Sequence, residues 1–488
     1  MNQRYQATPT LRRVILGIYW LGLVACSPED ETLQDYPRTA AVLHQTSLSA
    51  GEVHYSLYSD ARDPQSLSEA TVSGQIYAWF ESGASVAEVR FFVDDQWVDE
   101  RTERIAPYSL GGDRGVGQLL AYDTDRLSAG EHTLVVRVRF PGSNPPQEYT
   151  VPFTVGPAVP AGRVFYVATD GSDDNDGKQA GRPFKTIGRA AEAVEPGDTV
   201  RVASGTYAEA IESLVSGQPG QRITFVSTEK HGAVIDASGD DAAWLNHGSY
   251  VDIVNFEVTG SNYIGIHNRG SYVTVRGNHV HHLAAPDCNG ANGGAGILHG
   301  NYEAHHNAVI GNLVHDILPS EGCTLIHGIY VSNPRAKVLN NIVYNTRGYG
   351  IHTWHYATKV TISGNLTLNN GQGGILLGGS EVVMDGAVVT NNVVVDNRVG
   401  AGIYELGNIG QNTYRNNLLW NNNINLRDST KGENTITADP LLVASGDVYR
   451  LESNSPAVDQ GTERGASELD YDGQVRIAPL DIGPFNLE

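Results

Sequence analysis

"HGIYVSNPRAKVLNNIVYNTRGYGIH", residues 327–352, contains one short pattern twice: a glycine and an isoleucine, followed by an aromatic residue. The glycines of the two copies are 22 residues apart. The pattern also occurs as "IGIH", "AGIL", "GGIL" and "AGIY", and its glycines lie at positions 265, 296, 328, 350, 374 and 402. Repeats of this length are typical of solenoids, in which each repeat forms one coil and stacks on the next.

A second repeat has the same register. Asparagines follow a short apolar strand in each coil, at positions 278, 312, 341, 365, 392 and 417. Stacked asparagines can hydrogen-bond from coil to coil and satisfy the backbone at a turn. The two repeats together predict a solenoid of parallel strands.

The register also predicts which side chains face outward. The isoleucine after each glycine is expected in the core, so the next residue points out of the coil. These outward residues are His267, Leu298, Tyr330, His352, Leu376 and Tyr404. Adjacent strands lie about 4.8 Å apart, so Tyr330 and His352 are expected to be neighbours.

Composition limits the class of protein. The chain has 488 residues, a net charge of −22 and 40% hydrophobic residues, enough for two domains with a large core. So acidic a chain is a poor partner for nucleic acid. We expect a monomer that does not bind nucleic acid.

Residues 1–25 have the features of a signal peptide. Arg12 and Arg13 precede the apolar run "VILGIYWLGLVA", which ends in "LVAC". This stretch resembles bacterial lipoprotein signals, which implies cleavage before Cys26 and lipid attachment to its sulfur. With Ser27 next to it, we expect an outer-membrane lipoprotein that faces the periplasm or the cell surface, touching the membrane only through the lipid. Residues 26–50 are expected to be a tether.

Residues 51–156 alternate between apolar and polar positions in short runs such as "TVSGQIYAWF" and "GEHTLVVRVRF". Period-two patterning separated by turn residues predicts a small antiparallel β-sandwich. The segment resembles the immunoglobulin-like modules of bacterial surface proteins, and we interpret it as a spacer. A linker rich in proline and glycine, residues 157–162, follows.

The segment after the linker, "FYVATDGSDDNDGKQAGRPFKTIGRAAEAVEPGDTVRVASGTYAE" (165–209), predicts a strand, a turn and a short helix. It is similar to the N-terminal cap of right-handed parallel β-helix proteins of the pectate-lyase-like superfamily, including polysaccharide lyases. The final segment, with "DPLL", "SPAVD" and "DIGPF", resembles their C-terminal caps. The expected fold is therefore all-β, with a right-handed parallel β-helix over residues 163–488 preceded by the sandwich.

Charge indicates where a substrate binds. No Asp or Glu occurs between Glu321 and Glu381, a run of 59 residues in a chain with 55 acidic residues. The run contains cations and histidines, which favours a polyanionic partner. Asparagine ladders explain part of the gap, because stacked like charges repel. We predict an acidic, uronic-acid-containing polysaccharide as substrate.

β-Elimination from such a polymer needs neutralisation of the carboxylate, a base for the neighbouring proton, and an acid for the leaving oxygen. We predict His352 or His327 as base and Tyr330 as acid or paired base. Arg335 or Arg347 is expected to neutralise the carboxylate. The predicted substrate-binding residues are Trp354, Tyr349, His355, Lys359, Lys337, Tyr404 and His299.

Other functions on this fold remain open: a glycoside hydrolase using Asp385 or Glu405, a C5-epimerase, or a surface carbohydrate-binding protein without catalysis. A hydrolase needs a pair of carboxylates beside the bond, and the central run has none, so a polysaccharide lyase is favoured.

Two further cysteines and several candidate metal ligands lie in the predicted β-helix. Once Cys26 carries lipid, Cys288 and Cys323 are expected to form a disulfide in an oxidising compartment. The resemblance suggests calcium as a cofactor, with Asp287, Glu303 and Glu321 as candidate ligands. The pairs His281–His282 and His305–His306 are interpreted as solvated turns, because no third ligand is spaced nearby.

Overall fold

The computed structural model describes residues 51–56, 64–82, 84–98, 102–104, 108–112, 119–142, 145–156, 162–290, 292–319, 322–397, 399–427, 432–467 and 469–487. The predicted signal peptide, Cys26, the tether, Glu321 and most of the linker lie outside these residues. Within them, no helix is long and apolar enough to cross a membrane.

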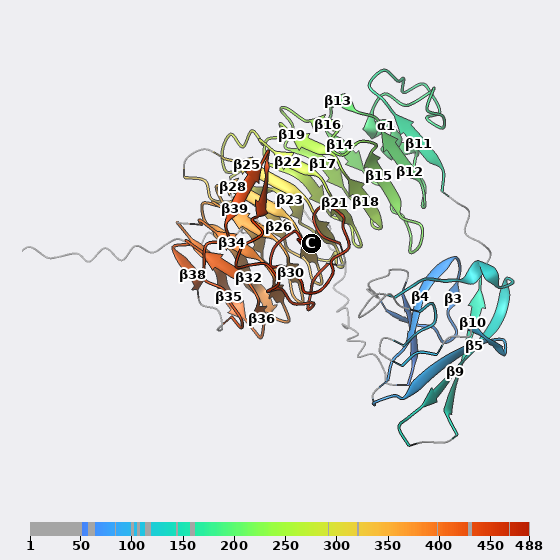
Figure 1. Cartoon of the computed structure of the whole chain (residues 1–488). Helices are drawn as coiled ribbons and strands as arrows, with labels where there is room; N and C mark the ends of the chain where they lie inside the picture. The colour runs from blue at the N-terminus through green and yellow to red at the C-terminus, as the bar shows by residue number, and fades with distance from the viewer. Residues whose placement is uncertain are drawn as a thin grey trace, which may run out of the picture. The chain divides into compact units, whose positions relative to one another are not determined.

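The N-terminal part is a sandwich of two small sheets (Figure 1). One contains β1 (Val53–Ser56), β2 (Gln65–Ser66), β4 (Gln75–Phe80), β7 (Tyr108–Ser109) and β8 (Tyr122–Asp123). The other contains β3 (Thr71–Val72), β5 (Glu88–Val93), β6 (Gln96–Trp97), β9 (Gly130–Arg139) and β10 (Gln147–Val155). All pairs are antiparallel except β3 with β10. Alternate residues of β9 are buried, as the pattern predicted; the likeness to immunoglobulin modules and the domain limits stay predictions.

The rest of the chain is a right-handed parallel β-helix with three sheets, and each coil passes through them in the order sheet 1, sheet 2, sheet 3. Sheet 1 consists of β11 (Val164–Val167), β12 (Thr199–Val202), β15 (Ile223–Ser227), β18 (Val251–Val254), β21 (Thr274–Arg276), β24 (Ala308–Ile310), β27 (Lys337–Leu339), β30 (Thr361–Ser363), β33 (Val388–Thr390) and β36 (Thr413–Arg415). Sheet 2 consists of β13 (Gly205–Tyr207), β16 (Ala233–Asp236), β19 (Glu257–Thr259), β22 (His279–His281), β25 (Leu313–Ile317), β28 (Ile342–Thr346), β31 (Leu366–Leu368), β34 (Val393–Val395) and β37 (Leu418–Trp420). Sheet 3 consists of β14 (Ile211–Ser213), β17 (Ala242–Asn246), β20 (Ile264–Asn268), β23 (Gly294–His299), β26 (Ile326–Val331), β29 (Tyr349–Thr353), β32 (Gly373–Met384), β35 (Ala401–Ile409) and β38 (Ile424–Arg427).

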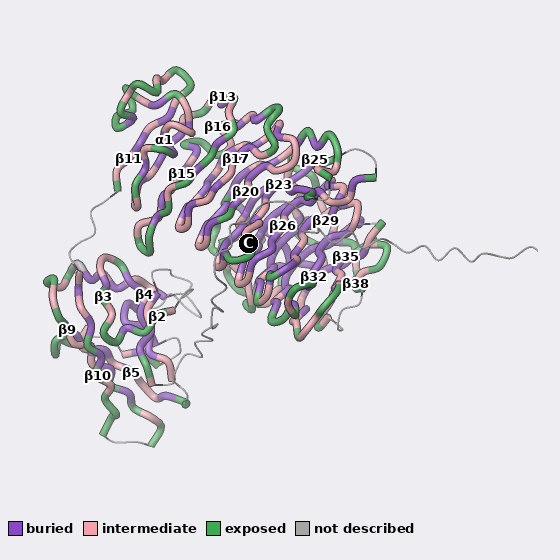
Figure 2. The backbone as a smooth tube through the Cα atoms, turned by 180° about the vertical axis from the view of Figure 1, so that it is seen from behind, coloured by how far each residue is buried: buried purple, intermediate pink, exposed green. Residues whose placement is uncertain are grey.

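The glycine–isoleucine repeat lies in sheet 3, one copy in each coil from β20 to β35. All six isoleucines are fully buried, at 0% exposure, which confirms the predicted facing. Glycine is required because the next coil lies too close for a side chain. A Cβ on Gly328 would lie 2.6 Å from the carbonyl oxygen of Gly350 in that coil. Figure 2 shows strands of this sheet largely in purple, the colour of buried residues, and green mainly in turns.

The asparagine ladder forms as predicted, at the turn between sheets 1 and 2. In every step the Oδ1 of one asparagine accepts hydrogen bonds from the backbone N–H and the Nδ2 of the asparagine one coil earlier. Asn341 shows the pattern, accepting from the backbone N–H of Asn312 at 3.0 Å and from its Nδ2 at 2.9 Å. The ladder therefore fixes the register of the coils from Asn278 to Asn417.

The ends of the β-helix have separate covers. At the N-terminal end α1 (Ile187–Ala193), capped by Thr186, buries Ile187, Ala190 and Ala191, which confirms the predicted helix. At the other end, residues around Glu433 and Ile436 pair with the last coil.

The C-terminal segment, residues 438–487, does more than cover the last coil. It includes the hairpin of β39 (Leu442–Ser445) and β40 (Val448–Leu451), and its side chains pack on the outward face of sheet 2. Leu451, Tyr471, Ile482 and Phe485 form one buried cluster with sheet-2 residues Leu313, Ile342, Tyr344, Leu366, Val393, Val395 and Leu418. We call this segment the C-terminal strap.

Candidate active site on sheet 3

The outward row of sheet 3 matches the prediction. The strands pair in the register His267, Leu298, Tyr330, His352, Leu376, Tyr404, followed by Arg427. The rings of Tyr330 and His352 stack with centroids 4.7 Å apart and planes 14° apart. Leu376, next in the row, is the exception to the outward exposure, because it is only 2% exposed.

The two predicted catalytic histidines, His327 and His352, are linked by consecutive hydrogen bonds that begin at a backbone N–H. The backbone N–H of Tyr349 donates to Nδ1 of His327 at 3.1 Å, so this histidine carries its proton on Nε2. That Nε2–H then donates to Nδ1 of His352, 2.9 Å away. His352 in turn holds its own proton on Nε2, which is buried and has no hydrogen-bond partner among the described residues.

These hydrogen bonds leave neither histidine with a free lone pair. Burial lowers the pKa of His327 to about 3 and lowers the pKa of His352 well below its ordinary value, so both imidazoles are neutral. Both nitrogens of His327 are occupied, and the remaining nitrogen of His352 is a donor. The catalytic roles of His327 and His352 stay predictions. In this arrangement His327 accepts from the backbone of Tyr349, and His352 stacks on the ring of Tyr330.

The structure brings together three residues near the ends of sheet-3 strands. Tyr302 and His355 lie in the turns after β23 and β29, and Glu381 lies within β32. The Oε1 of Glu381 lies 2.9 Å from Nδ1 of His355, and Nε2 of the same imidazole lies 3.0 Å from the hydroxyl of Tyr302. The carboxylate holds the proton on Nδ1, so the Nε2 lone pair faces the tyrosine hydroxyl. His355 is 5% exposed, whereas Tyr302 is 44% exposed. A buried, oriented base therefore sits behind an accessible phenol.

Electrostatics favours the ionised form of Glu381. Burial opposes ionisation, but hydrogen bonds from Ser380 and His355 outweigh it and lower the pKa of the carboxyl. The ring of His355 lies 6.5 Å from the ring of Tyr330, so this Glu–His–Tyr arrangement and the Tyr330–His352 stack share one surface.

Sequence reasoning placed His355 among the binding residues and missed Tyr302 and Glu381 altogether. Tyr302 lies in the turn after β23, and Glu381 lies in the part of β32 where the pairing with β35 is interrupted, between Gly379 and Met384. The repeat therefore gave no register for these positions. The one available signal was Glu381 itself, the first carboxylate after the acid-free run.

Two predicted cations lie in turns between sheet 3 and sheet 1. Arg335 follows β26, and its Nη1 is 3.4 Å from Nε2 of His306. Lys359 precedes β30, and its backbone N–H donates to the backbone carbonyl of Asp385. Among the residues that the structure describes, Arg335 pairs with no carboxylate, so its charge is available to a ligand. Lys337, in contrast, lies in β27 of sheet 1 rather than on the sheet-3 surface.

The other predicted contacts divide into aromatic and buried groups. Trp354 lies over Gly378 of the next coil, where a Cβ would be 1.8 Å from its Cε3. Tyr404 has the guanidinium of Arg427 over its ring at 4.6 Å. Burial raises the pKa of Tyr349 to about 12, so its phenol is neutral. Arg347 lies in the turn before β29, and its Nε is buried with no partner in the described part of the chain.

His299 does not face the surface, and its predicted contact with substrate is wrong. Its exposure is 0%, and its Nδ1 is 2.9 Å from Nδ2 of Asn268. The side chain belongs to a short ladder inside the coil, above Asn246 and Asn268.

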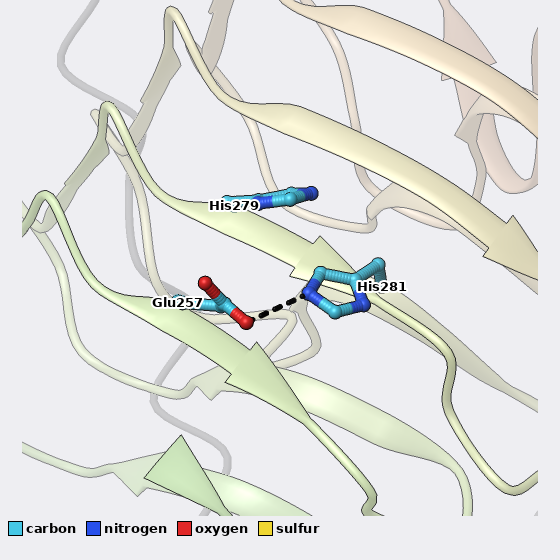
Figure 3. Close-up of side chains that lie close together, drawn as sticks. All are labelled: Glu257, His279 and His281. Carbon is cyan, nitrogen blue, oxygen red and sulfur yellow. Dashed lines mark hydrogen bonds and ion pairs between the residues drawn. The ribbon is translucent and has the colours of Figure 1, made fainter. Parts of the chain in front are cut away.

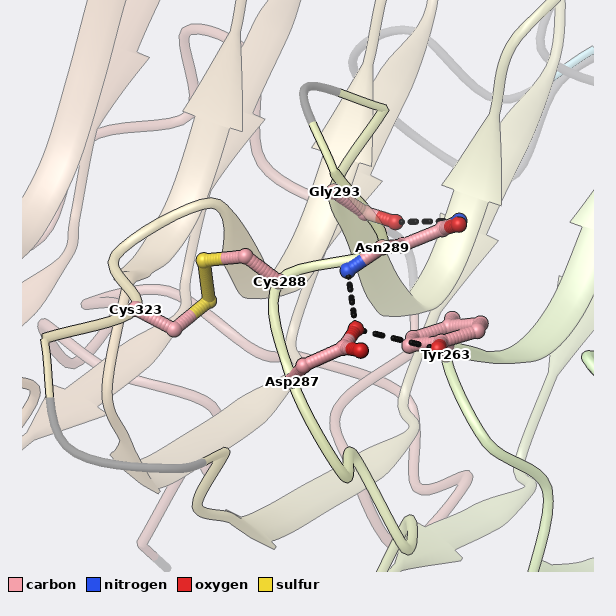
Figure 4. The surroundings of a disulfide bond; sticks show 6 residues. All are labelled: Tyr263, Asp287, Cys288, Asn289, Gly293 and Cys323. Carbon is pink, nitrogen blue, oxygen red and sulfur yellow. Dashed lines mark hydrogen bonds between the residues drawn. A yellow bond between two sulfur atoms is a disulfide. The ribbon is translucent and has the colours of Figure 1, made fainter.

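The disulfide is confirmed: Cys288 and Cys323 are bonded and join the loop after β22 to the loop before β26 (Figure 4). Asp287 beside it accepts from the hydroxyl of Tyr263 at 3.0 Å and from the backbone of Asn289 at 2.7 Å. Neither Asp287 nor Glu303 gathers two further metal-binding groups among the described residues, and calcium stays a prediction.

The carboxylates required by the hydrolase alternative are engaged by the protein. Glu405 is 6% exposed and accepts hydrogen bonds from Tyr414 and Asn412. Asp385 accepts from the backbone of Gln411 at 2.7 Å. No contact places either beside Tyr330 or His352 in the described structure.

Known proteins share the fold and part of the sequence. Residues 165–316 match the family described as "Pel9A-like, right handed beta helix region", and residues 302–440 match the family described as "Periplasmic copper-binding protein (NosD)". Pectate lyase L of Dickeya dadantii is 24% identical over 341 residues, which cover 63% of this chain and 77% of that protein.

Two further matches differ in extent. The uncharacterized protein YwoF of Bacillus subtilis is 39% identical over 83 residues, only 17% of this chain and 17% of its own length. The crystal structure of pectate lyase Pel9A superposes with a TM-score of 0.52 and 19% identity, covering 68% of this chain and 98% of that one. This last likeness shows the fold of the β-helix.

Proposed function

We propose that this chain, whose right-handed parallel β-helix is of the pectate-lyase-like type, is a polysaccharide lyase that cleaves a uronic-acid-containing polysaccharide by β-elimination. The main support for this proposal is the Glu381–His355–Tyr302 arrangement, which lies on the same surface as Tyr330 and His352. Nδ1 of His355 is 2.9 Å from Glu381 Oε1, and its Nε2 is 3.0 Å from the hydroxyl of Tyr302.

In the proposed reaction, Tyr302 is the base. Its oxygen takes the proton from the carbon next to the uronate carboxylate, while its own proton passes to Nε2 of His355. Glu381 stabilises the imidazolium that forms, because it holds the opposite nitrogen. Arg335, in the adjacent coil, neutralises the carboxylate and so stabilises the carbanion-like transition state.

Tyr330 is the proposed acid. Its hydroxyl protonates the glycosidic oxygen as the carbon–oxygen bond breaks and the carbon–carbon double bond forms. His355 has then gained one proton and Tyr330 has lost one, and solvent returns the proton between turnovers. The stack with neutral His352 holds the phenol in place without adding a charge that would keep it ionised.

Product chemistry tests the class of function. Full-length protein is incubated with pectate, alginate, chondroitin sulfate, heparinoids and ulvan, and ultraviolet absorbance of the unsaturated product is followed together with reducing ends. We expect both signals on at least one uronate polymer. Reducing ends without absorbance would identify a hydrolase, and binding with neither would identify a carbohydrate-binding protein.

Variants test the assignment of the base. Tyr302→Phe, His355→Gln and Glu381→Gln are each expected to lower kcat by about 10²- to 10⁴-fold. The control is Tyr166→Phe, which removes a phenol from β11 at the far end of the β-helix. A Tyr302→Phe enzyme with a rate within threefold of the parent would overturn the role of Tyr302 and leave the class of reaction intact.

We further propose that the enzyme is held at the outer membrane by a lipid on Cys26. The main support for this proposal is the sequence "LVAC", which follows an apolar run and ends at Cys26. Metabolic labelling with palmitate should mark the parent chain in the membrane fraction, and Cys26→Ser should be unlabelled. Labelling of the Cys26→Ser chain would refute the proposal.

A further inference from the structure

A group of histidines lies on the outward face of sheet 2, away from the proposed active site. Strands β19, β22 and β25 pair so that Glu257 is beside His279, and His281 is beside His315. His231 and His282 lie against the same group, with ring centroids 5.3 Å from His279 and 5.0 Å from His281. These residues continue the rows of sheet 2 beyond the apolar part that the C-terminal strap covers.

The nitrogens of this group face one another and nearby carboxylates. Nε2 of His279 lies 2.7 Å from Nε2 of His315. Nδ1 of His315 donates to Oδ2 of Asp316 at 2.7 Å, and Asn345 donates to the other oxygen of that carboxylate at 3.0 Å. Figure 3 shows the neighbouring contact, in which Nε2 of His281 is 3.2 Å from Glu257 while His279 points across the same space.

The hydrogen bonds of His315 leave one of its nitrogens for a metal. Its Nδ1–H donates to Asp316, so its Nε2 carries the lone pair, and that Nε2 faces Nε2 of His279. Neutral imidazole is a ligand for Zn²⁺ and Cu²⁺. A histidine that donates its other N–H to a carboxylate, as His315 does to Asp316, is oriented and made more basic for a metal.

We propose that His279, His315 and Asp447 bind one divalent transition-metal ion of the zinc or copper class. The donor atoms of these three residues all lie within 4.8 Å of one another. The two Nε2 atoms would separate from 2.7 Å to about 3.3 Å, the spacing that a tetrahedral site with metal–nitrogen bonds of about 2.0–2.1 Å requires. The interpretation of the neighbouring pair His281–His282 as a solvated turn stays a prediction, because neither of these residues is a ligand of the proposed site.

The third ligand gives the site a role in the fold. Asp447 lies in the turn between β39 and β40, at the edge of the C-terminal strap, and its carbonyl accepts from the hydroxyl of Tyr344 at 3.0 Å. An ion held by His279, His315 and Asp447 would join the strap to two coils of the β-helix. A second group, Glu257 with His279 and His281, shares His279, but there His281 is already paired with the carboxylate.

Zinc titration tests the site. Untagged full-length protein, stripped with a chelator, is titrated with Zn²⁺ by calorimetry at pH 7.5, with Co²⁺ absorbance as a probe of tetrahedral geometry. We expect one equivalent of Zn²⁺ and a higher Tm in its presence. Substitutions His279→Gln, His315→Gln and Asp447→Asn should each weaken zinc binding at least tenfold, and Asp316→Asn about 10- to 100-fold.

The control is the double variant His305→Gln/His306→Gln, which removes an adjacent histidine pair in a different turn. It should bind zinc like the parent chain. Because Asp447 is exposed, Asp447→Asn should fold even where a buried histidine variant does not. A folded parent chain that binds no Zn²⁺ at micromolar concentration, or that binds it equally well after Asp447→Asn and His279→Gln, would overturn the proposal.

Discussion

At the scale of single residues, the proposed site separates two kinds of imidazole. His327 and His352 receive their hydrogen bonds in a line from the backbone of Tyr349, so the fold fixes their tautomers. His355 is instead held by the side chain of Glu381 and keeps a lone pair toward Tyr302. In the proposed site, the imidazoles of His327 and His352 therefore orient their neighbours, whereas the imidazole of His355 accepts a proton.

Tyr330→Phe tests the assignment of the acid. The variant keeps the ring that stacks on His352 but lacks the proton for the leaving oxygen, so kcat should fall about 10²- to 10⁴-fold with little change in KM. Steady-state absorbance assays measure both constants, and Tyr250→Phe, in the turn between sheets 3 and 1, serves as the control. A rise in KM at constant kcat would show that Tyr330 only binds the substrate.

Sequence could predict the neighbours in the outward row but not the rest of the site. Strand periodicity is fixed at two, so the placement of Tyr330 beside His352 follows from the repeat alone. Tyr302 lies in a turn and Glu381 in an irregular stretch of β32, and the paths of both depend on packing that no periodic pattern describes. The inward turn of His299 was missed for a related reason, since it belongs to a ladder of different residue types.

At the scale of elements, the asparagine ladder holds the coils in register from the inside. Each asparagine in the middle of the ladder satisfies buried backbone groups of the coil before it, a role that a side chain without an amide cannot fill.

Asn341→Ala is expected to lower the free energy of unfolding by at least about 2 kcal/mol, because the backbone N–H of Asn312 and the carbonyl of Val309 lose their buried partner. Urea denaturation gives this value, and Asn423→Ala, at an exposed position, is the control expected to change it by less than about 0.5 kcal/mol. Equal effects of the two substitutions would contradict the account of the ladder.

A contact between neighbouring coils supports a second prediction. The indole of Trp354 lies where a side chain on Gly378 would be, so Gly378→Ala should displace the indole without touching Tyr302 or His355. If Trp354 stacks on a sugar, KM should rise about 3- to 10-fold with kcat nearly constant, and Trp354→Ala should behave alike. Gly181→Ala is the control, because a Cβ added at Gly181 meets no atom within 4 Å, and its KM should equal that of the parent. An unchanged KM in Gly378→Ala would contradict the role of Trp354.

At the scale of the whole molecule, buried neutral histidines make the β-helix sensitive to acid. Burial lowers the pKa of His267 to about 4 and those of His299 and His327 to about 3. In the unfolded chain the histidine pKa is about 6.5, so below that pH the unfolded state binds more protons than the folded state. Their contribution to stability is therefore complete above about pH 6.5 and is lost as the pH falls toward the folded values.

We expect the free energy of unfolding to fall by up to about 1.4 kcal/mol per pH unit for each of these histidines, a total on the order of 5 kcal/mol between pH 6.5 and 5.0. Urea denaturation at pH 7.5, 6.5 and 5.0 measures the change. The variant His299→Asn, with one such group fewer, should show a shallower slope. A free energy independent of pH over this range would mean that the imidazoles are already exposed to solvent.

The C-terminal strap has a consequence for the order in which the parts of the β-helix fold. It contacts positions far apart along the β-helix: Asn416 donates to Gln460, Asn391 to Thr462 and Asn340 to Leu469, while Lys230 lies 4.9 Å from the ring of Tyr471. While the chain folds, the stacked coils keep an open apolar stripe on sheet 2 until residues 438–487 pack against it. A chain truncated near residue 437 should therefore fail at coils far from its end, because the outward face of sheet 2 stays exposed and prone to aggregation.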